Sequence, residues 1–289
     1  METFSRGGVT VYSDYCENIV VDPGHPILAW KANKERFSPT LFPSHIRALY
    51  PDGLPRIGNR HSEDALSWNL FRSLQLAGKL PLITDFIASE SDFDIVYFWA
   101  RDASQWGNKV DRDIQECLNK MEPWGKDGIK QQTETDVILR GKHHLIIVEC
   151  KLGKPSEMVR AWCRSRPGMR SQYKDFVKEL DTNLFSDSFD FEKDGNRFYQ
   201  LFRNYLLGAA LSLKWGVDFS LLAIVNSLNT NLEGRNHAEE FGCFQSLLRD
   251  SSNVFLITWK VIWNRLRFEA GLDALQEWLL NYPPLQLNR

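Results

Sequence analysis

Three charged side chains lie at the ends of two apolar segments and have the types needed for phosphodiester chemistry. Asp136 opens the first segment (Thr-Asp-Val-Ile-Leu), and Glu149 and Lys151 close the second (Ile-Ile-Val-Glu-Cys-Lys). Side chains alternate along a strand, so Glu149 and Lys151 share one face. Carboxylate oxygens are the ligands that Mg²⁺ and Mn²⁺ prefer, and a lysine can orient water or neutralise charge that develops on a phosphate. The alternative is a cross-strand ion pair without a function.

The two segments are rich in β-branched residues and are joined by a short stretch containing Gly, which predicts an antiparallel hairpin. A four-residue loop (Gly-Lys-His-His) pairs Arg140 with Leu145. Counting along the ladder then places Asp136 opposite Glu149, so that two carboxylates face each other. A two-residue loop would instead place Glu134 opposite Glu149. The preferred register is the one that pairs Asp136 with Glu149.

A helix is expected to bring a third carboxylate to this site. Ser62 is a good N-cap residue, leucines follow at helical spacing, and Gly78 ends the pattern. At about 100° per residue, Glu63 lies on the same side as Leu70, on the buried stripe. The alternative is that Glu63 and Asp64 only stabilise the helix N-terminus through its dipole.

The segment from 151 to 178 carries eight basic residues against two acidic ones, a local charge of +6. Beside a phosphodiester site, such a run favours contact with nucleic acid, because phosphates must be attracted and their counterions released. Trp162 and Tyr173 are candidates for stacking on bases. The alternative is a solvated surface helix with aromatic anchors. The predicted phosphate-contacting residues in this segment are Lys154, Arg160, Arg164, Arg166, Arg170 and Lys174.

A helix predicted over 198–213 is apolar nearly all round except for one polar cluster of Gln200, Arg203 and Asn204. Buried polar groups need hydrogen-bond partners, so the cluster is expected to line the same site. Gln200 is a candidate catalytic residue and Arg203 a candidate phosphate contact. Ordinary hydrogen bonding to a neighbouring loop is the alternative.

The rest of the chain predicts a large globular unit. Its 289 residues carry a net charge of −2, so any attraction to nucleic acid must be local. Five scattered cysteines without a C-x-x-C pair, no signal-peptide pattern and no bilayer-length apolar run predict a cytoplasmic protein without a membrane partner. We expect an irregular arm over 1–60 packed on a domain over 61–289. Further elements are predicted as strands at 9–12, 92–100, 219–226 and 253–260, helices at 44–50, 110–121, 261–267 and 272–280, and a polar loop at 230–239.

The order of these elements and the motifs Thr-Asp-Val-Ile-Leu and Ile-Ile-Val-Glu-Cys-Lys resemble the PD-(D/E)xK nuclease superfamily, which has the restriction-endonuclease-like fold. Asp136 matches its metal-binding aspartate, and Glu149 and Lys151 match its E-x-K. Glu63 matches a helix glutamate of many members. Gln200 followed by Tyr205 is similar to the Q-x-x-x-Y of RecB-like members, with one residue too many. The resemblance covers roughly 60–226, with insertions at 101–130 and 155–195. In the domain division, the second insertion is taken to begin earlier, at about 152–195, and it holds most of the basic segment.

This resemblance implies an α/β fold with a mixed central sheet flanked by helices, and hydrolysis of DNA that depends on Mg²⁺ or Mn²⁺. Asp136 and Glu149 would hold the metal, with Glu63 either as a further ligand or as a residue that positions water. The implied protein is an endonuclease of restriction, phage defence or mobile elements, as a homodimer or in a multi-protein system, with RNA as the alternative substrate. Two other classes are open: an inactive nucleic-acid-binding or scaffolding module of this fold, and a metal-dependent enzyme acting on a small molecule.

Overall fold

A computed structural model describes residues 3–6, 9–12, 63–87, 92–102, 111–122, 135–152, 169–180, 182–226, 237–282 and 285. The predicted helix at 44–50 and most of the predicted arm lie outside these residues. The strand predicted at 9–12 is β2 (Val9–Tyr12), which pairs with β1 (Thr3–Arg6) in a two-stranded sheet.

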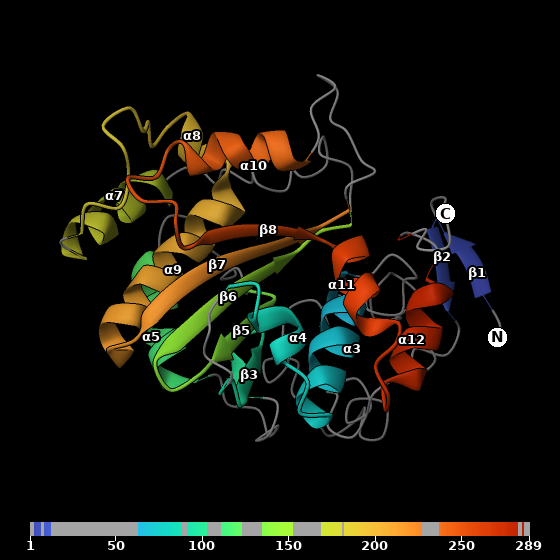
Figure 1. The fold of residues 1–289 in the computed structure, drawn as a ribbon. Helices are drawn as coiled ribbons and strands as arrows, with labels where there is room; N and C mark the ends of the chain where they lie inside the picture. Colours follow the sequence, from blue (N-terminus) through green and yellow to red (C-terminus); the bar gives the residue numbers. More distant parts are fainter. Residues whose placement is uncertain are drawn as a thin grey trace, which may run out of the picture.

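The described core is a six-stranded mixed sheet of order β4-β3-β5-β6-β7-β8 (Figure 1). β3, β4, β5 and β6 pair antiparallel, whereas β6, β7 and β8 pair parallel. This arrangement confirms the predicted α/β fold with a mixed central sheet. The strands are β3 (Ile95–Phe98), β4 (Arg101–Asp102), β5 (Val137–Arg140), β6 (His144–Cys150), β7 (Asp218–Val225) and β8 (Val254–Thr258).

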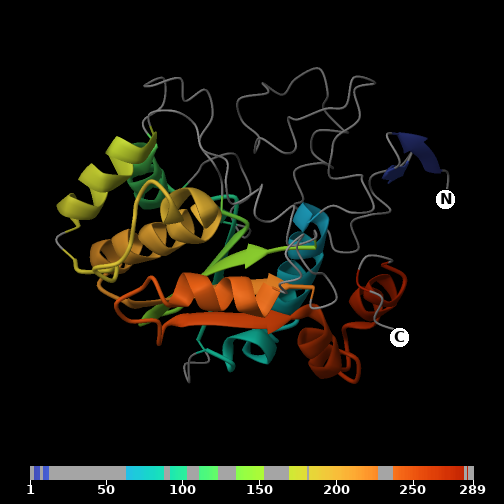
Figure 2. The same ribbon diagram turned by 90° about the horizontal axis from the view of Figure 1, so that it is seen from above.

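Alternating side chains divide the sheet between two hydrophobic cores, because successive residues point to opposite faces. One core packs against α3 (Glu63–Leu76), α4 (Pro81–Thr84), α11 (Trp259–Leu266) and α12 (Asp273–Leu280). The other packs against α5 (Arg112–Met121), α7 (Met169–Glu179), α9 (Tyr199–Trp215) and α10 (His237–Gln245), with the short α8 (Asp194–Arg197) preceding α9. Helices therefore cover both faces, and α10 lies alongside β8 (Figure 2).

The hairpin has the register predicted from its sequence. β5 and β6 pair with Arg140 opposite Leu145. Continuing this register one step past the last pair places Asp136 opposite Glu149, and the alternative with Glu134 in that position is wrong. Both Asp136 and Glu149 belong to the set of alternating side chains that faces the α9 core.

The strand predicted at 92–100 ends earlier than expected. β3 stops at Phe98, and Trp99 and Ala100 have φ angles of +51° and +65°. They form a two-residue turn, so that Phe98 pairs with Arg101 of β4. Neither residue type favours positive φ, and therefore the turn could not be predicted from the residue types.

The polar loop predicted at 230–239 is also too long. His237 already begins α10, and Glu239 and Glu240 lie in its first turn, where acidic side chains are favourable. Phe241 and Phe244 are three residues apart and both are buried in the α9 core. This helical spacing was the signal for α10 within the sequence.

A glycine allows α9 to lie close to the sheet. A Cβ atom added at Gly208 would stand 2.6 Å from the Phe219 ring and 3.2 Å from the Ile147 side chain. Real Cβ atoms do not approach other atoms as closely as 2.6 Å. Gly208 therefore sets the separation between α9 and strands β6 and β7, on which the position of the polar cluster of α9 depends.

We expect Gly208→Ala to destabilise the protein by about 1 kcal/mol, because overpacking outweighs the higher helix propensity of alanine. The matched control is Gly242→Ala in α10, where an added Cβ meets nothing within 4 Å. That substitution should raise the free energy of unfolding by about 0.5 to 1 kcal/mol. Urea denaturation of both variants checks this, and equal stabilisation by both would show that α9 has room to spare.

Candidate active site

Glu63, Glu149 and Lys151 meet at the end of the sheet where β6 finishes and α3 begins. The Lys151 Nζ atom lies 2.7 Å from Glu149 Oε1 and donates to Glu63 Oε2 at 3.3 Å. The Glu63 Oε1 atom accepts from the backbone N–H of Leu152 at 2.7 Å. Glu63 therefore points inward, as its place on the helix predicted, and one ammonium joins two carboxylates.

Asp136 lies beside this group and belongs to the same electrostatic cluster. Its Oδ2 accepts from the backbone N–H of Cys150 at 2.8 Å. Burial raises the pKa of Asp136 well above its usual range, and the charge of Glu149 raises it further, while Lys151 acts in the opposite direction. The charge of Asp64 also raises this pKa. The first turn of α3 thus brings the charges of two acids near Asp136, although only Glu63 contacts Lys151.

Lys151 is fixed at both its backbone and its side chain. Its N–H donates to Ile224 O of β7 at 2.8 Å, and its carbonyl accepts from Trp259 Nε1 at 3.2 Å. Burial disfavours the charged side chain, but Glu149 and the other nearby acids outweigh burial, so the pKa of Lys151 lies well above its usual range. The ammonium form is therefore strongly favoured in this arrangement.

Asn204 of α9 is the side chain that contacts Glu149 most directly from outside the hairpin. Its Nδ2 donates to Glu149 Oε2 at 2.6 Å. Its Oδ1 accepts from Thr135 Oγ1 at 3.1 Å and from Arg203 Nη2 at 2.8 Å. The sequence placed Asn204 in the polar cluster without assigning it a partner, and it gave no signal for Thr135.

Gln200 lies one turn before Asn204 on the same side of α9. Its side chain is half-buried, and its Oε1 has no hydrogen-bond partner within the described part of the chain. Tyr205 behaves differently, because its hydroxyl donates to the Asp250 carbonyl at 3.3 Å. Tyr205 thus bonds to the chain just before β8, whereas Asn204 bonds to Glu149.

Arg203 differs from its predicted role as a phosphate contact. The side chain is fully buried, and its Nε and Nη2 atoms donate to Asn204 Oδ1. Burial acts to lower the pKa of Arg203, but Tyr199, Glu122 and other neighbouring groups outweigh it and raise the pKa. Arg203 is therefore an internal partner of the site and does not face solvent.

Tyr173 was predicted as a candidate for base stacking, and its position corrects that prediction. It is 3 % exposed, and its hydroxyl donates to Glu122 Oε1 at 2.8 Å. Tyr199 donates to the same carboxylate oxygen. These contacts fasten α7 to α5 and α9, so Tyr173 is an anchor of the helix, as the alternative reading of the basic segment expected.

Most of the predicted phosphate-contacting residues lie outside the described part of the chain, namely Lys154, Arg160, Arg164 and Arg166. Arg170 belongs to α7, but its side chain is not described. Lys174 is exposed on α7, with its Nζ 5.8 Å from the centre of the Phe191 ring. The structure therefore leaves the basic segment as a prediction.

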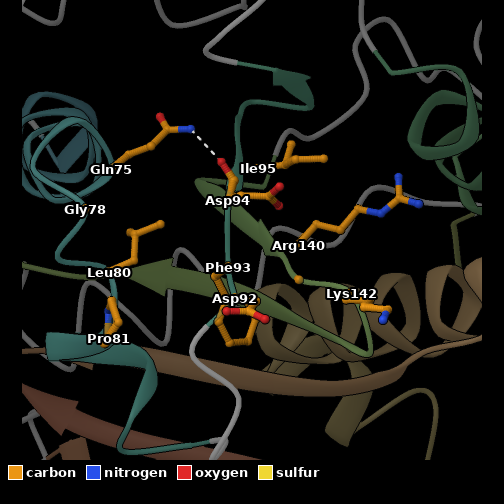
Figure 3. A pocket seen from close by; sticks show the side chains of 11 residues that line it. Gln75, Gly78, Leu80, Pro81, Asp92, Phe93, Asp94, Ile95, Arg140 and Lys142 are labelled. Carbon is orange, nitrogen blue, oxygen red and sulfur yellow. Dashed lines mark hydrogen bonds between the residues drawn. The ribbon is translucent and has the colours of Figure 1, made fainter.

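A cavity of about 920 Å³ lies at the other end of the sheet, beside the β5–β6 turn (Figure 3). Asp92, Asp94, Arg140 and Lys142 are among its lining residues, and Gln75 donates across to the carbonyl of Asp94. None of the predicted site residues lines it. The hollow and the carboxylate cluster are thus separate features.

As they stand, no three His, Cys, Asp or Glu side chains among the described residues are gathered closely enough to hold a metal ion. The donor chemistry nevertheless fits Mg²⁺, which is commonly bound through one or two carboxylates together with waters and substrate phosphates. Asp136 and Glu149 face the same side of adjacent strands, and the charge of Glu149 raises the pKa of Asp136. A divalent cation would relieve that unfavourable pairing of like charges.

A mixed sheet flanked by helices, with an aspartate and an E-x-K motif facing each other across its central hairpin, defines a restriction-endonuclease-like protein. Residues 58–282 match the model of a family described as "Restriction Endonuclease associating with ARP". The chain belongs to this family, which confirms the resemblance seen in its motifs. No curated protein and no solved structure gives a significant match. None of the described helices is long and apolar enough to cross a membrane.

Proposed function

We propose that this protein is a metal-dependent endonuclease that hydrolyses DNA. The observation that carries the proposal is the cluster in which Glu63, Asp136, Glu149 and Lys151 come together from α3 and the two strands of the hairpin. Glu149 and Lys151 are buried and Asp136 and Glu63 are half-buried, and holding three acids together away from water costs stability, so the cluster points to a functional site. Family membership supports the endonuclease class.

Asp136 and Glu149 would hold Mg²⁺ or Mn²⁺, and Glu63 is the candidate further ligand. A bound divalent ion supplies Lewis-acid polarisation of a phosphoryl oxygen and a more acidic bound water. The chain itself keeps the carboxylates in place, through the backbone N–H of Cys150 on Asp136 and that of Leu152 on Glu63.

Lys151 would act as a donor to the phosphate, because its ammonium already lies among carboxylates at the end of β6. Donating a hydrogen bond to a phosphate oxygen stabilises the negative charge that develops there during hydrolysis. Gln200, half-buried one turn from Asn204, is the candidate to orient the substrate backbone or a water.

DNA is the proposed substrate, and both the family and the local charge of +6 over 151–178 in a chain of net charge −2 support it. The description of the family also names an association with ARP. We therefore propose that the chain works with a partner protein in restriction or phage defence.

The test uses circular plasmid DNA, purified protein and either Mg²⁺ or EDTA. We expect the wild type to cleave the plasmid with Mg²⁺ but not with EDTA. In Glu149→Gln the cleavage rate with Mg²⁺ should fall at least about 100-fold. The matched control is Glu240→Gln, another buried glutamate, which pairs with Arg197 on α8. That control should cleave like the wild type.

Other results would select the alternatives. Mg²⁺-independent DNA binding without cleavage would favour an inactive nucleic-acid-binding module. A small-molecule substrate would be favoured if the protein binds the metal and its activity is unchanged when the charges of Arg164 and Arg166 are reversed. Equal cleavage by wild type and Glu149→Gln would remove the proposed site.

A further inference from the structure

We propose that Asn204 is a positioning residue that fixes Glu149, an inference that rests on the proposed function. Each of the three site carboxylates has one oxygen held by a neutral N–H group. Backbone groups hold Asp136 and Glu63, whereas the side chain of Asn204 holds Glu149. The tie to Glu149 is therefore the one that a side-chain substitution can remove.

The orientation of the Asn204 amide is determined by its neighbours. A guanidinium only donates and a carboxylate only accepts, so Oδ1 must face Arg203 and Nδ2 must face Glu149. Thr135 adds a further donor to Oδ1 at 3.1 Å. The amide is thus held on one side by two residues and presents its N–H group to Glu149 on the other.

Burial makes this arrangement rigid and exacting. Thr135, Glu149, Arg203 and Asn204 are each at most 2 % exposed. Water does not replace a missing donor readily at such a position, and an unsatisfied buried group is costly. With Oε2 held by Asn204, Glu149 presents its Oε1 on the side where Lys151 lies, 2.7 Å away.

Asn204 and Arg203 therefore have different roles on α9. Asn204 sets the orientation of the Glu149 carboxylate, and Arg203 in turn orients the amide of Asn204. Outer partners of metal-binding carboxylates typically contribute 10- to 100-fold to metal affinity or activity. Asn204 should therefore influence metal binding without touching the substrate.

The experiment measures Mn²⁺ binding by calorimetry, together with the kinetics of DNA cleavage. We expect Asn204→Ala to weaken Mn²⁺ binding about 10-fold and to lower kcat with little change in the KM for DNA. Asn204→Asp should be worse, because it replaces the donor with a carboxylate beside Glu149. The matched control is the adjacent Tyr205→Phe, which also loses one hydrogen bond of α9 but should bind Mn²⁺ like the wild type.

Circular dichroism and thermal unfolding establish that each variant is folded. If Asn204→Ala does not fold, Asn204→Ser serves instead, since its hydroxyl is too short to replace the amide. Wild-type Mn²⁺ affinity in a folded Asn204 variant, with Glu149→Gln impaired, would overturn this inference alone. A wild-type protein that neither binds Mn²⁺ nor cleaves DNA would instead overturn the proposed function.

Discussion

Lys151→Met is expected to abolish cleavage and to destabilise the metal-free protein by about 3 kcal/mol. The substitution keeps the length and apolar stem of the side chain but removes its charge. Glu149, whose side chain is 2 % exposed, would then lie next to Asp136 and Glu63 without the ammonium. Breaking a buried ion pair by removing one partner is far costlier than never having built it, because the remaining charge is left uncompensated.

Chemical denaturation with and without Mg²⁺ measures this effect, and the cation should restore part of the lost stability because it replaces the missing positive charge. The matched control is Lys79→Met, which removes an ion pair of the same 2.7 Å length with Glu269 at a more exposed position. Such a surface pair contributes at most about 1 kcal/mol. If the Lys151→Met variant has the same free energy of unfolding as Lys79→Met, then Lys151 does not compensate the charge of the acids.

The hairpin shows how far local sequence information reaches. The apolar runs, the Gly-containing loop and the alternation of side chains were enough to pair Arg140 with Leu145 and to place Asp136 opposite Glu149. Glu63 was predicted to point inward from its place on the buried stripe of α3, and it contacts Lys151 and Leu152. Each of these features depends on the periodicity of side chains along one strand or one helix, and this periodicity can be read directly from the sequence.

The contacts that the sequence did not predict join distant segments. Asn204 and Glu149 are 55 residues apart, and Tyr173 and Glu122 are 51 apart. The polar cluster of its helix predicted a phosphate contact for Arg203, and the basic segment predicted base stacking for Tyr173, but both side chains are buried. Whether a polar side chain on a helix faces solvent or a buried acid depends on how the helices pack, and no local pattern encodes that packing.

Asp136→Asn is expected to abolish cleavage and yet to stabilise the metal-free protein by about 1 kcal/mol at pH 7.5. The folded protein holds Asp136 beside Glu149 in a buried setting that raises its pKa well above the ordinary value of 3.8. Asparagine has nearly the same shape, keeps an oxygen for the Cys150 N–H, and carries no charge. The variant should therefore lose the metal site and gain stability together.

The pH dependence gives the sharper form of this prediction. A carboxyl group with a raised folded pKa contributes stability that is fully present below its unfolded pKa and is lost as pH rises through the folded pKa. The stability gain of Asp136→Asn should thus be small near pH 4 and should grow toward pH 7.5. Denaturation at both pH values measures this gain. The control is Asp94→Asn at an exposed position, which should change the free energy of unfolding little at either pH.

Mn²⁺ should stabilise the wild type but not Asp136→Asn, because in the wild type the cation relieves the unfavourable interaction between two facing carboxylates. A variant less stable than the wild type at both pH values would show that Asp136 serves the fold and not the metal.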